Sequence, residues 1–487
     1  IMSSDWSSDV CSSDLQWLFF SFSAMTLLSI FIAVIADFFY IAAVPALLLL
    51  AYLTVVDFRK IFFLLLFCIP LSTEFYFPNG FGTDLPTEPL MIGLMGVFLF
   101  YVIRHSDEMD AGFWRHPITL LLLLHVSWVS ITVVTSDLFF VSLKFLLAKF
   151  WYVITFYFLA GMLLRRQSDI RKLLWVILIP LCITIVIILA KHAVLGFTFE
   201  SVYSVLHPFY RNHVVYASIM AIFVPFVWFV VQWYRPWSLK WLFLAGALLL
   251  LLVGIQFAYT RAAYVAIFIA IGAYFIIRWR LTKYVLAAAL IGAVALVGFL
   301  ALDNRYLDYA PNYERTITHD NFGNLIEATY KLEDISTMER VYRWIAGTYM
   351  SKDKPVFGFG PGNFYNFYVP YTVRSFETYV SDNPEKSGIH SYYLMVLVEQ
   401  GYIGLAIFLI LLFYILLRGE RVYHQSESLR QKQMVMIALL MIIVISSLQI
   451  INDLLETDKI GPFFFMAMAI LVRVDLENKK RENGVRA

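Results

Sequence analysis

Four polar side chains in an otherwise apolar chain have the types that group transfer requires. His390 begins the stretch "HSYYLMVLVEQGYIG", where a polar loop meets a long hydrophobic run. Imidazole accepts a proton near neutral pH, which few other side chains do. Arg261, Arg340 and Arg211 carry planar guanidinium groups, which suit the binding of phosphate. These residue types predict a base at His390 and phosphate binding by the arginines.

Each of these residues also has a purely structural explanation. Arg261 stands alone between two apolar runs and can extend to the membrane interface, while Arg211 can anchor the start of a span. Arg340 lies beside Glu339 and can belong to a helix with surface ion pairs. His390 can serve as an interfacial aromatic residue. Spacing alone leaves both explanations open for all four.

The sequence gives little support for a metal centre. His207 and His213 lie close together near Arg211, but two histidines without a third ligand are weak evidence for zinc. No DxD or HExxH motif occurs, and three cysteines are too few and too scattered for a disulfide framework. We therefore predict chemistry without a metal and without a cofactor.

The elements that must position these residues are membrane helices. Of the 487 residues, 61% are hydrophobic and 15% are charged. Uncharged runs of about 20 residues recur, which is the length that crosses a bilayer. The net charge of +2 gives no reason to expect nucleic acid as a partner. We predict an all-α polytopic membrane protein with about 12–14 transmembrane helices, in contact with membrane lipids.

Lysine and arginine predict which way the helices run. The candidate spans cover residues 17–36, 38–56, 60–72, 89–104, 117–135, 139–163, 173–196, 213–233, 240–259, 262–278, 284–301, 390–417, 432–451 and 458–473. Alternate connections, such as "DFRK", "RRQSDIRK" and "RWRLTK", are rich in basic residues. The positive-inside rule assigns these connections to the cytoplasm. The start of the His390 span then faces the periplasm.

The chain divides into five parts. We interpret residues 1–15, with their repeated Ser-Ser-Asp, as sequencing-adapter read-through rather than protein sequence. We expect an N-terminal transmembrane bundle over 16–301, C-terminal transmembrane helices over 390–474 and a cytoplasmic tail over 475–487. Residues 302–389 are the one large polar segment and predict a periplasmic loop subdomain. Within it, "STMERVYRWIAGTYM" predicts an amphipathic helix, and the glycines of "PVFGFGPGNFYNFY" predict a compact loop.

Roughly residues 200–450 resemble the O-antigen ligase and O-antigen polymerase superfamily. The family pattern combines R-x3-W, a glycine loop, a histidine at a helix start and E-x-G-x-x-G. The matching residues are Arg340, Trp344, Pro355, Gly358, Gly360, Gly362, Phe364, His390, Ser391, Glu399, Gly401 and Gly404. "TRAAYVA" is similar to the family's upstream element and contributes Arg261. Ser391 stands where the family commonly has asparagine.

The resemblance implies a glycosyltransferase of the GT-C type in the bacterial inner membrane, with its active site facing the periplasm. Such enzymes move a glycan from undecaprenyl diphosphate to a hydroxyl acceptor without metal. By resemblance, His390 deprotonates the acceptor, which attacks with inversion, and the arginines at 261 and 340 hold the diphosphate. We add Arg211 as a third candidate for diphosphate binding. Trp344, Glu399 and the glycines then support the site.

The acceptor and the class of function remain open at this stage. In ligases the acceptor is a lipid A–core sugar, in polymerases it is another lipid-linked repeat unit, and in related oligosaccharyltransferases it is a protein. The long single segment before His390 favours the ligase-like branch. A transporter of lipid-linked sugars is the second alternative. Transporters usually carry charged residues along a central pathway, and here Lys144 and Lys149 would have to supply them, because the spans are otherwise nearly uncharged.

Overall fold

The computed structural model describes residues 12–35, 41, 44–76, 82–165, 167–303, 305, 335–377, 381, 383, 386–482 and 484. Within these ranges, ten helices are long and apolar enough to cross a membrane, and two shorter apolar helices precede them. The prediction of an all-α polytopic membrane protein is therefore confirmed. The interpretation of residues 1–15 falls mostly outside the described residues and stays a prediction.

The helices follow one another with short connections over most of the chain. In the first half they are α1 (Ser12–Ile35), α2 (Val44–Val56), α3 (Phe58–Cys68), α4 (Thr87–Arg104), α5 (Ala111–Trp114), α6 (Pro117–Val134), α7 (Phe139–Val153), α8 (Ala160–Leu163) and α9 (Gln167–Val194). A π-helical turn, η4 (Ile154–Leu159), joins α7 to α8, and shorter turns are η2 (Ile69–Leu71) and η3 (Ser106–Glu108).

The second half has the same character and contains the large polar segment. Its helices are α10 (Val202–Leu206), α11 (His213–Val231), α12 (Leu239–Phe257), α13 (Arg261–Arg278), α14 (Thr282–Ala301), α16 (Ile335–Asp353), α17 (Phe364–Phe367), α18 (Tyr392–Gln425), α19 (Leu429–Leu448) and α20 (Gly461–Glu482). Two 3-10 turns, η7 (Val369–Tyr371) and η8 (Arg374–Phe376), follow α17.

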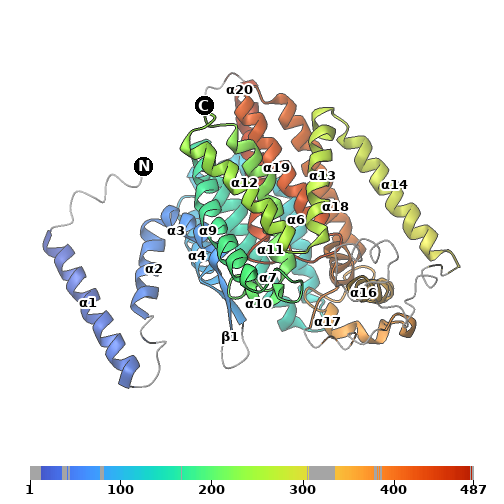
Figure 1. Ribbon diagram of the computed structural model, residues 1–487, viewed down its shortest axis with the longest axis horizontal. Coiled ribbons are helices and arrows are strands. Elements are labelled where there is room, and N and C mark those ends of the chain that lie inside the picture. The colour runs from blue at the N-terminus through green and yellow to red at the C-terminus, as the bar shows by residue number, and fades with distance from the viewer. Residues whose placement is uncertain are drawn as a thin grey trace.

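The centre of the bundle is formed by helices far apart in sequence. Helix α19 packs against α11, α13 and α20, and most of its side chains are buried. Helices α1, α2 and α14 lie at the periphery of the bundle (Figure 1). They expose large apolar side chains such as Phe31, Leu48 and Ile291, as helices that face lipid do.

Two predicted spans differ from the observed helices. Helix α3, expected over 60–72, has 11 residues, and its length of about 16 Å is too short to cross a bilayer about 30 Å thick. Helix α18 is interrupted at Gly401, whose φ of 71° and ψ of −178° are not helical. The part before this break rises only about 13 Å. The candidate span Tyr392–Gln425 thus agrees with the start that we expected near residue 390, but it consists of two helical parts that meet at Gly401.

A small β-hairpin was not predicted. Strands β1 (Thr73–Tyr76) and β2 (Gly82–Leu85) pair antiparallel, with Thr73 opposite Leu85 and Tyr76 opposite Gly82. The hairpin lies in the connection between α3 and α4. Strands this short carry too few alternating positions for the sequence to reveal them.

The connections separate into two ends of the bundle, as alternating spans require. At the end that we call the basic end, Arg418 pairs with Asp475 at 2.6 Å and Arg59 pairs with Asp169 at 2.7 Å. At the hairpin end, the Lys459 ammonium donates to the carbonyl oxygen of Ile69 at 2.6 Å. Figure 1 shows β1, α16 and α17 at one end and the C-terminus at the other.

The described part of the polar segment lies at the hairpin end. Helix α16 confirms the predicted amphipathic helix: Met338, Tyr342, Ala346 and Met350 are buried. Tyr342, Ala346 and Met350 form a small hydrophobic cluster with residues of the glycine loop and of α18. This cluster fixes α16 against the start of α18, where His390 lies. The proposed boundaries of the subdomain remain a prediction.

Candidate functional site

A cavity of about 150 Å³ at the hairpin end brings two of the predicted arginines together. Arg261 and Arg340 both line it, although they lie on α13 and α16. The remaining lining residues come from α10 and the segment before it, from the start of α11, from the turn between α12 and α13 with the start of α13, and from the loop before α20. They are Phe199, Tyr203, His213, Val214, Tyr259, Thr260, Ala262, Ile451 and Asn452. Guanidinium groups from two separate helices therefore face one small space.

The turn between α12 and α13 determines where Arg261 lies. Tyr259 has a positive φ of 50°, and its hydroxyl donates to the carbonyl oxygen of Phe197 at 2.5 Å. The Thr260 hydroxyl donates to the carbonyl oxygen of His213 at 3.2 Å. These two bonds tie the turn to the connection before α11. Arg261, the first residue of α13, is thereby held at the helix end, half-buried beside the cavity.

The expected ion pair next to Arg340 involves a different arginine. Arg343, one turn further along α16, lies 3.4 Å from Glu339, and both side chains are buried. The other oxygen of Glu339 accepts a hydrogen bond from Ser381 at 2.7 Å. Arg343 also donates to the carbonyl oxygen of Gly388 at 3.1 Å. Glu339 and Arg343 thus bind α16 to the segment that leads into His390.

His390 occupies a strained backbone position just before α18. Its φ is 56°, a left-handed conformation that non-glycine residues rarely adopt. The side chain is 31% exposed, and its Nδ1 atom lies 4.0 Å from Oδ1 of Asp453. This separation is too long for a hydrogen bond, so Asp453 is a charge neighbour rather than a bonded partner.

The electrostatic surroundings of His390 keep the imidazole neutral. Burial first, and then the positive charges of Arg343 and Arg340, lower the pKa of His390 to about 3. Burial also raises the pKa of Asp453 above its ordinary value. A neutral imidazole is the form that accepts a proton. Because Arg340 acts on His390 and also lines the cavity with Arg261, all three residues belong to one region.

The third predicted arginine lies elsewhere at the same end. Arg211 is exposed and is not among the described residues that line the cavity. Its charge instead acts on the hydroxyl of Tyr76 in the β-hairpin. The structure therefore brings Arg261 and Arg340 to one cavity. His390 is within the electrostatic reach of Arg340 but is not among the described residues that line this cavity, and Arg211 lies apart from it.

Sequence reasoning missed the cavity role of His213. It begins α11, lines the cavity, and its ring meets that of Tyr203 edge to face at 5.0 Å. Its Nδ1 atom is buried without a hydrogen-bond partner. We had considered His213 only as a metal ligand; among the described residues, no three metal-binding side chains gather. The sequence signal that could have revealed this position is that His213, like Arg261, lies at the start of a span.

The predicted glycine loop supports the break in α18. The Phe359 and Gly360 amides donate to the carbonyl oxygens of Val398 and Glu399, at 3.0 and 2.9 Å. Gly358 has a φ of 67°, and a Cβ there would collide with the backbone of residues 398–400. The loop therefore supplies hydrogen bonds to backbone groups that the interrupted helix cannot satisfy. Gly360 and Gly362 also have positive φ, at 90° and 76°.

Glu399 and Trp344 also stabilise the glycine loop. The Glu399 side chain is buried, and its Oε1 atom accepts a hydrogen bond from the Phe364 amide at 3.2 Å, at the start of α17. Trp344 is half-buried on α16 and packs against the cluster that contains Phe364. Both residues act here on the architecture of the glycine loop.

A buried lysine lies beneath the start of α18. The Lys149 ammonium donates to the Tyr392 hydroxyl at 2.9 Å and forms an ion pair with Glu456. The Tyr392 amide in turn donates to the carbonyl oxygens of Gln449 and Asn452, at 3.0 and 2.9 Å. Lys149 is therefore enclosed by partners, and it holds the residues next to His390 in place.

Comparison with known proteins relates this region to one family. The family model of O-antigen ligase matches residues 246–409, about a third of the chain. The matched segment contains α13, α16, the glycine loop and the start of α18, and with them Arg261, Arg340 and His390. No curated protein matches the chain.

Proposed function

Because the match over residues 246–409 supports membership of the O-antigen ligase family, we propose that the chain transfers a glycan from undecaprenyl diphosphate to a sugar hydroxyl. The observation that carries the proposal is the arrangement of His390, Arg261 and Arg340. Two guanidinium groups line one cavity, and a neutral imidazole lies within the electrostatic reach of one of them. This combination suits a reaction with a hydroxyl nucleophile and a phosphate leaving group.

In the proposed reaction, the imidazole of His390 takes the proton of the acceptor hydroxyl. The acceptor oxygen forms a bond to the anomeric carbon from the face opposite the diphosphate. The bond from the anomeric carbon to the phosphate oxygen breaks, and undecaprenyl diphosphate leaves with the electron pair. Arg261 and Arg340 stabilise the charge that develops on this leaving group. The configuration at the anomeric carbon inverts.

The same arrangement couples binding of the donor to the strength of the base. Burial, and then the charges of Arg343 and Arg340, lower the pKa of His390. A bound diphosphate places negative charge beside Arg340 and offsets that effect. The pKa of His390 therefore rises when the donor binds, and the imidazole becomes a stronger base in the complex.

The proposed location is the periplasmic face of a bacterial inner membrane. The cavity lies at the hairpin end, opposite the connections that are rich in lysine and arginine. The positive-inside rule assigns those basic connections to the cytoplasm. A base where a polar loop meets a membrane helix can reach both a lipid-embedded donor and a water-borne acceptor.

For the acceptor we favour a lipid A–core sugar, with a lipid-linked repeat unit, as in polymerases, as the alternative. The single long segment 302–389 favours the ligase branch. The transporter alternative is weakened by Lys149, which is 4% exposed and pairs with Glu456 instead of lining an open path.

The test is glycan transfer by the purified protein in lipid nanodiscs, with lipid-linked glycan and candidate acceptors. We expect His390→Ala to abolish transfer, whereas His207→Ala, at an exposed histidine of the same end, leaves it intact. Arg261→Lys should lose most of the activity, because an ammonium group cannot contact a diphosphate in two places. Transfer by His390→Ala at the unaltered rate would refute the proposal.

A further inference from the structure

A second, larger cavity than the one beside Arg261 has no part in the proposed reaction. It has a volume of about 560 Å³ and lies at the basic end, between α3, the end of α4, α8 and the start of α9. Helix α9 separates it from the Arg261 cavity. Ser168 and Asp169, in the first turn of α9, line the large cavity, whereas Phe199 and Tyr203, which follow its end, line the other. The 28 residues of α9 span about 40 Å.

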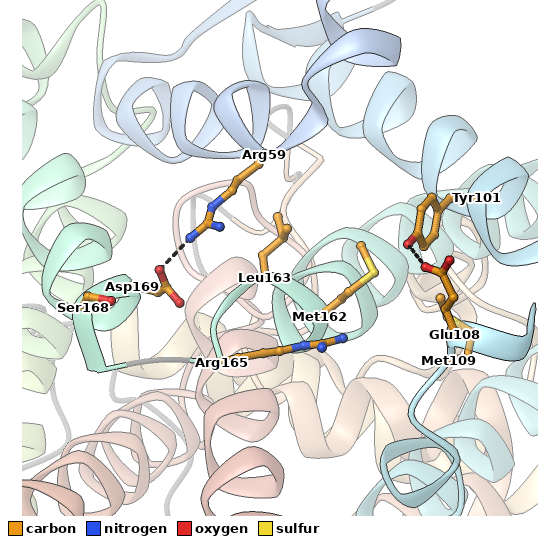
Figure 2. Close-up of a pocket in the computed structure, with 9 residues that line it drawn as sticks. All are labelled: Arg59, Tyr101, Glu108, Met109, Met162, Leu163, Arg165, Ser168 and Asp169. Atoms are coloured by element: carbon orange, nitrogen blue, oxygen red, sulfur yellow. Dashed lines mark hydrogen bonds and ion pairs between the residues drawn. The ribbon is translucent and has the colours of Figure 1, made fainter. Parts of the chain in front are cut away.

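Among the described residues, the charges around this cavity leave one guanidinium group without a counterion. Arg59 pairs with Asp169 at 2.7 Å, and Glu108 accepts a hydrogen bond from Tyr101 at 2.9 Å. Arg165 makes no ion pair with a carboxylate among the described residues. Figure 2 shows Arg59 and Arg165 entering the cavity from opposite sides, with Leu163 and Met162 between them.

Arg165 also has a second cation, Arg473, in its surroundings. Arg165 also lines a smaller adjoining cavity together with Arg473. Arg473 is already engaged, since it forms an ion pair with Asp110 and donates to the carbonyl oxygen of Gly161. Arg165 therefore has a like charge on one side and an open cavity on the other, so an anion in that cavity is favoured.

Apart from Ser168 and the charged and hydroxyl-bearing residues already named, apolar side chains line the two cavities. Met109 and Met162 line both, Leu163 lines the large cavity, and Phe98, Trp114 and Phe158 line the small one. A small soluble anion gains nothing from apolar side chains, whereas an amphiphile can bury its apolar part against them. Basic pockets between membrane helices on the cytoplasmic side are known sites for phospholipid headgroups.

We propose that this cavity binds the headgroup of a glycerophospholipid, with the phosphodiester on Arg165. Glu108 lies across the cavity as an exposed acceptor, which suits a hydrogen-bond donor at the far end of the headgroup. The hydroxyls of phosphatidylglycerol and the ammonium of phosphatidylethanolamine are such donors, and phosphatidylcholine has none. The lipid fastens α3, α4, α8 and α9 to one another at the leaflet opposite the reaction site.

The experiment titrates short-chain phospholipids into the full-length protein in detergent, with binding followed by native mass spectrometry and by the thermal midpoint. Phosphatidylglycerol or phosphatidylethanolamine should bind more tightly than phosphatidylcholine and should raise the midpoint. Arg165→Gln should weaken binding of all three roughly ten- to hundredfold, because it removes charge-assisted hydrogen bonds. Arg235→Gln, an equal charge change at an exposed site outside the cavity, should not.

Glu108→Gln tests the other half of the site. It should abolish the preference over phosphatidylcholine while leaving the affinity for phosphatidylcholine unchanged. If Arg165→Gln does not fold, Arg165→Lys keeps the charge and should still weaken binding several-fold, since it loses the two-point contact. Equal binding of all lipids by wild type and Arg165 variants would overturn the proposal. Inorganic phosphate that binds as tightly as the lipids would overturn the lipid assignment.

Discussion

The ion pair between Lys149 and Glu456 predicts a specific pattern of stability in a double-mutant cycle. The two residues are far apart in sequence, and their side chains are only 4% and 17% exposed. Glu456→Leu leaves the Lys149 ammonium buried with only the Tyr392 hydroxyl as a partner. Removal of one partner of a buried ion pair costs about 3–5 kcal/mol, because the remaining charge has lost its compensation.

The double variant Lys149→Met/Glu456→Leu should be far less damaging. With both charges gone, apolar side chains of similar volume fill the space, and such replacements are often close to neutral. The sum of the two single-variant losses in unfolding free energy should therefore exceed the loss in the double variant by at least about 2 kcal/mol. The free energy of unfolding is measured by denaturant titration in detergent micelles.

The chain offers a matched control for this cycle. Lys354 and Asp137 also form an ion pair, but their side chains are 34% and 41% exposed. An exposed pair contributes only about 0–1 kcal/mol, so its cycle should show little coupling.

The same variants test whether the pair positions His390. Tyr392, which Lys149 contacts, lies two residues after His390, so Glu456→Leu should lower the rate of transfer at temperatures where the protein stays folded. The double variant should recover part of the stability without recovering the full rate, because the bond to the Tyr392 hydroxyl is still lost. Additive losses of stability, with no coupling between the two sites, would refute the reasoning.

Three further outcomes follow from single positions. Gly401→Ala should lower the thermal midpoint and abolish transfer, because the residue has a φ of 71° and a Cβ there would collide with neighbouring backbone. The control Gly272→Ala on α13, where a Cβ meets nothing within 4 Å, should be neutral. The acid limb of kcat/KM should lie well below pH 6.5, since the pKa of His390 is lowered to about 3 in the free protein and the neutral form is the base; a limb near pH 6.5 would contradict this. Burial, and then the charge of Asp458, raises the pKa of Asp84 to about 7. The folded state therefore holds a proton that the unfolded state releases near pH 4, so stability should fall as pH rises from about 4 to 7. Asp84→Asn should remove this pH dependence of the thermal midpoint.

The sequence by itself determined the features that depend on local pattern. Hydropathy predicted the membrane helices, because burial in lipid requires an uninterrupted apolar run. The spacing of apolar residues predicted α16, and the polar loop before an apolar run predicted that His390 begins a helix. The alternation of basic connections predicted which segments lie at the same end. All of these signals are carried by neighbours in the chain.

Only the tertiary structure decided which distant groups meet. Glu339 pairs with Arg343, and Arg340 lines the cavity that it shares with Arg261. The break at Gly401 exists because the glycine loop bonds to the backbone there, and Arg211 lies by a hairpin that the sequence did not reveal. Such contacts depend on how segments that are distant in sequence pack against one another. Hydropathy constrains only the depth of a helix in the membrane, since apolar runs that face lipid and apolar runs that face the core look alike.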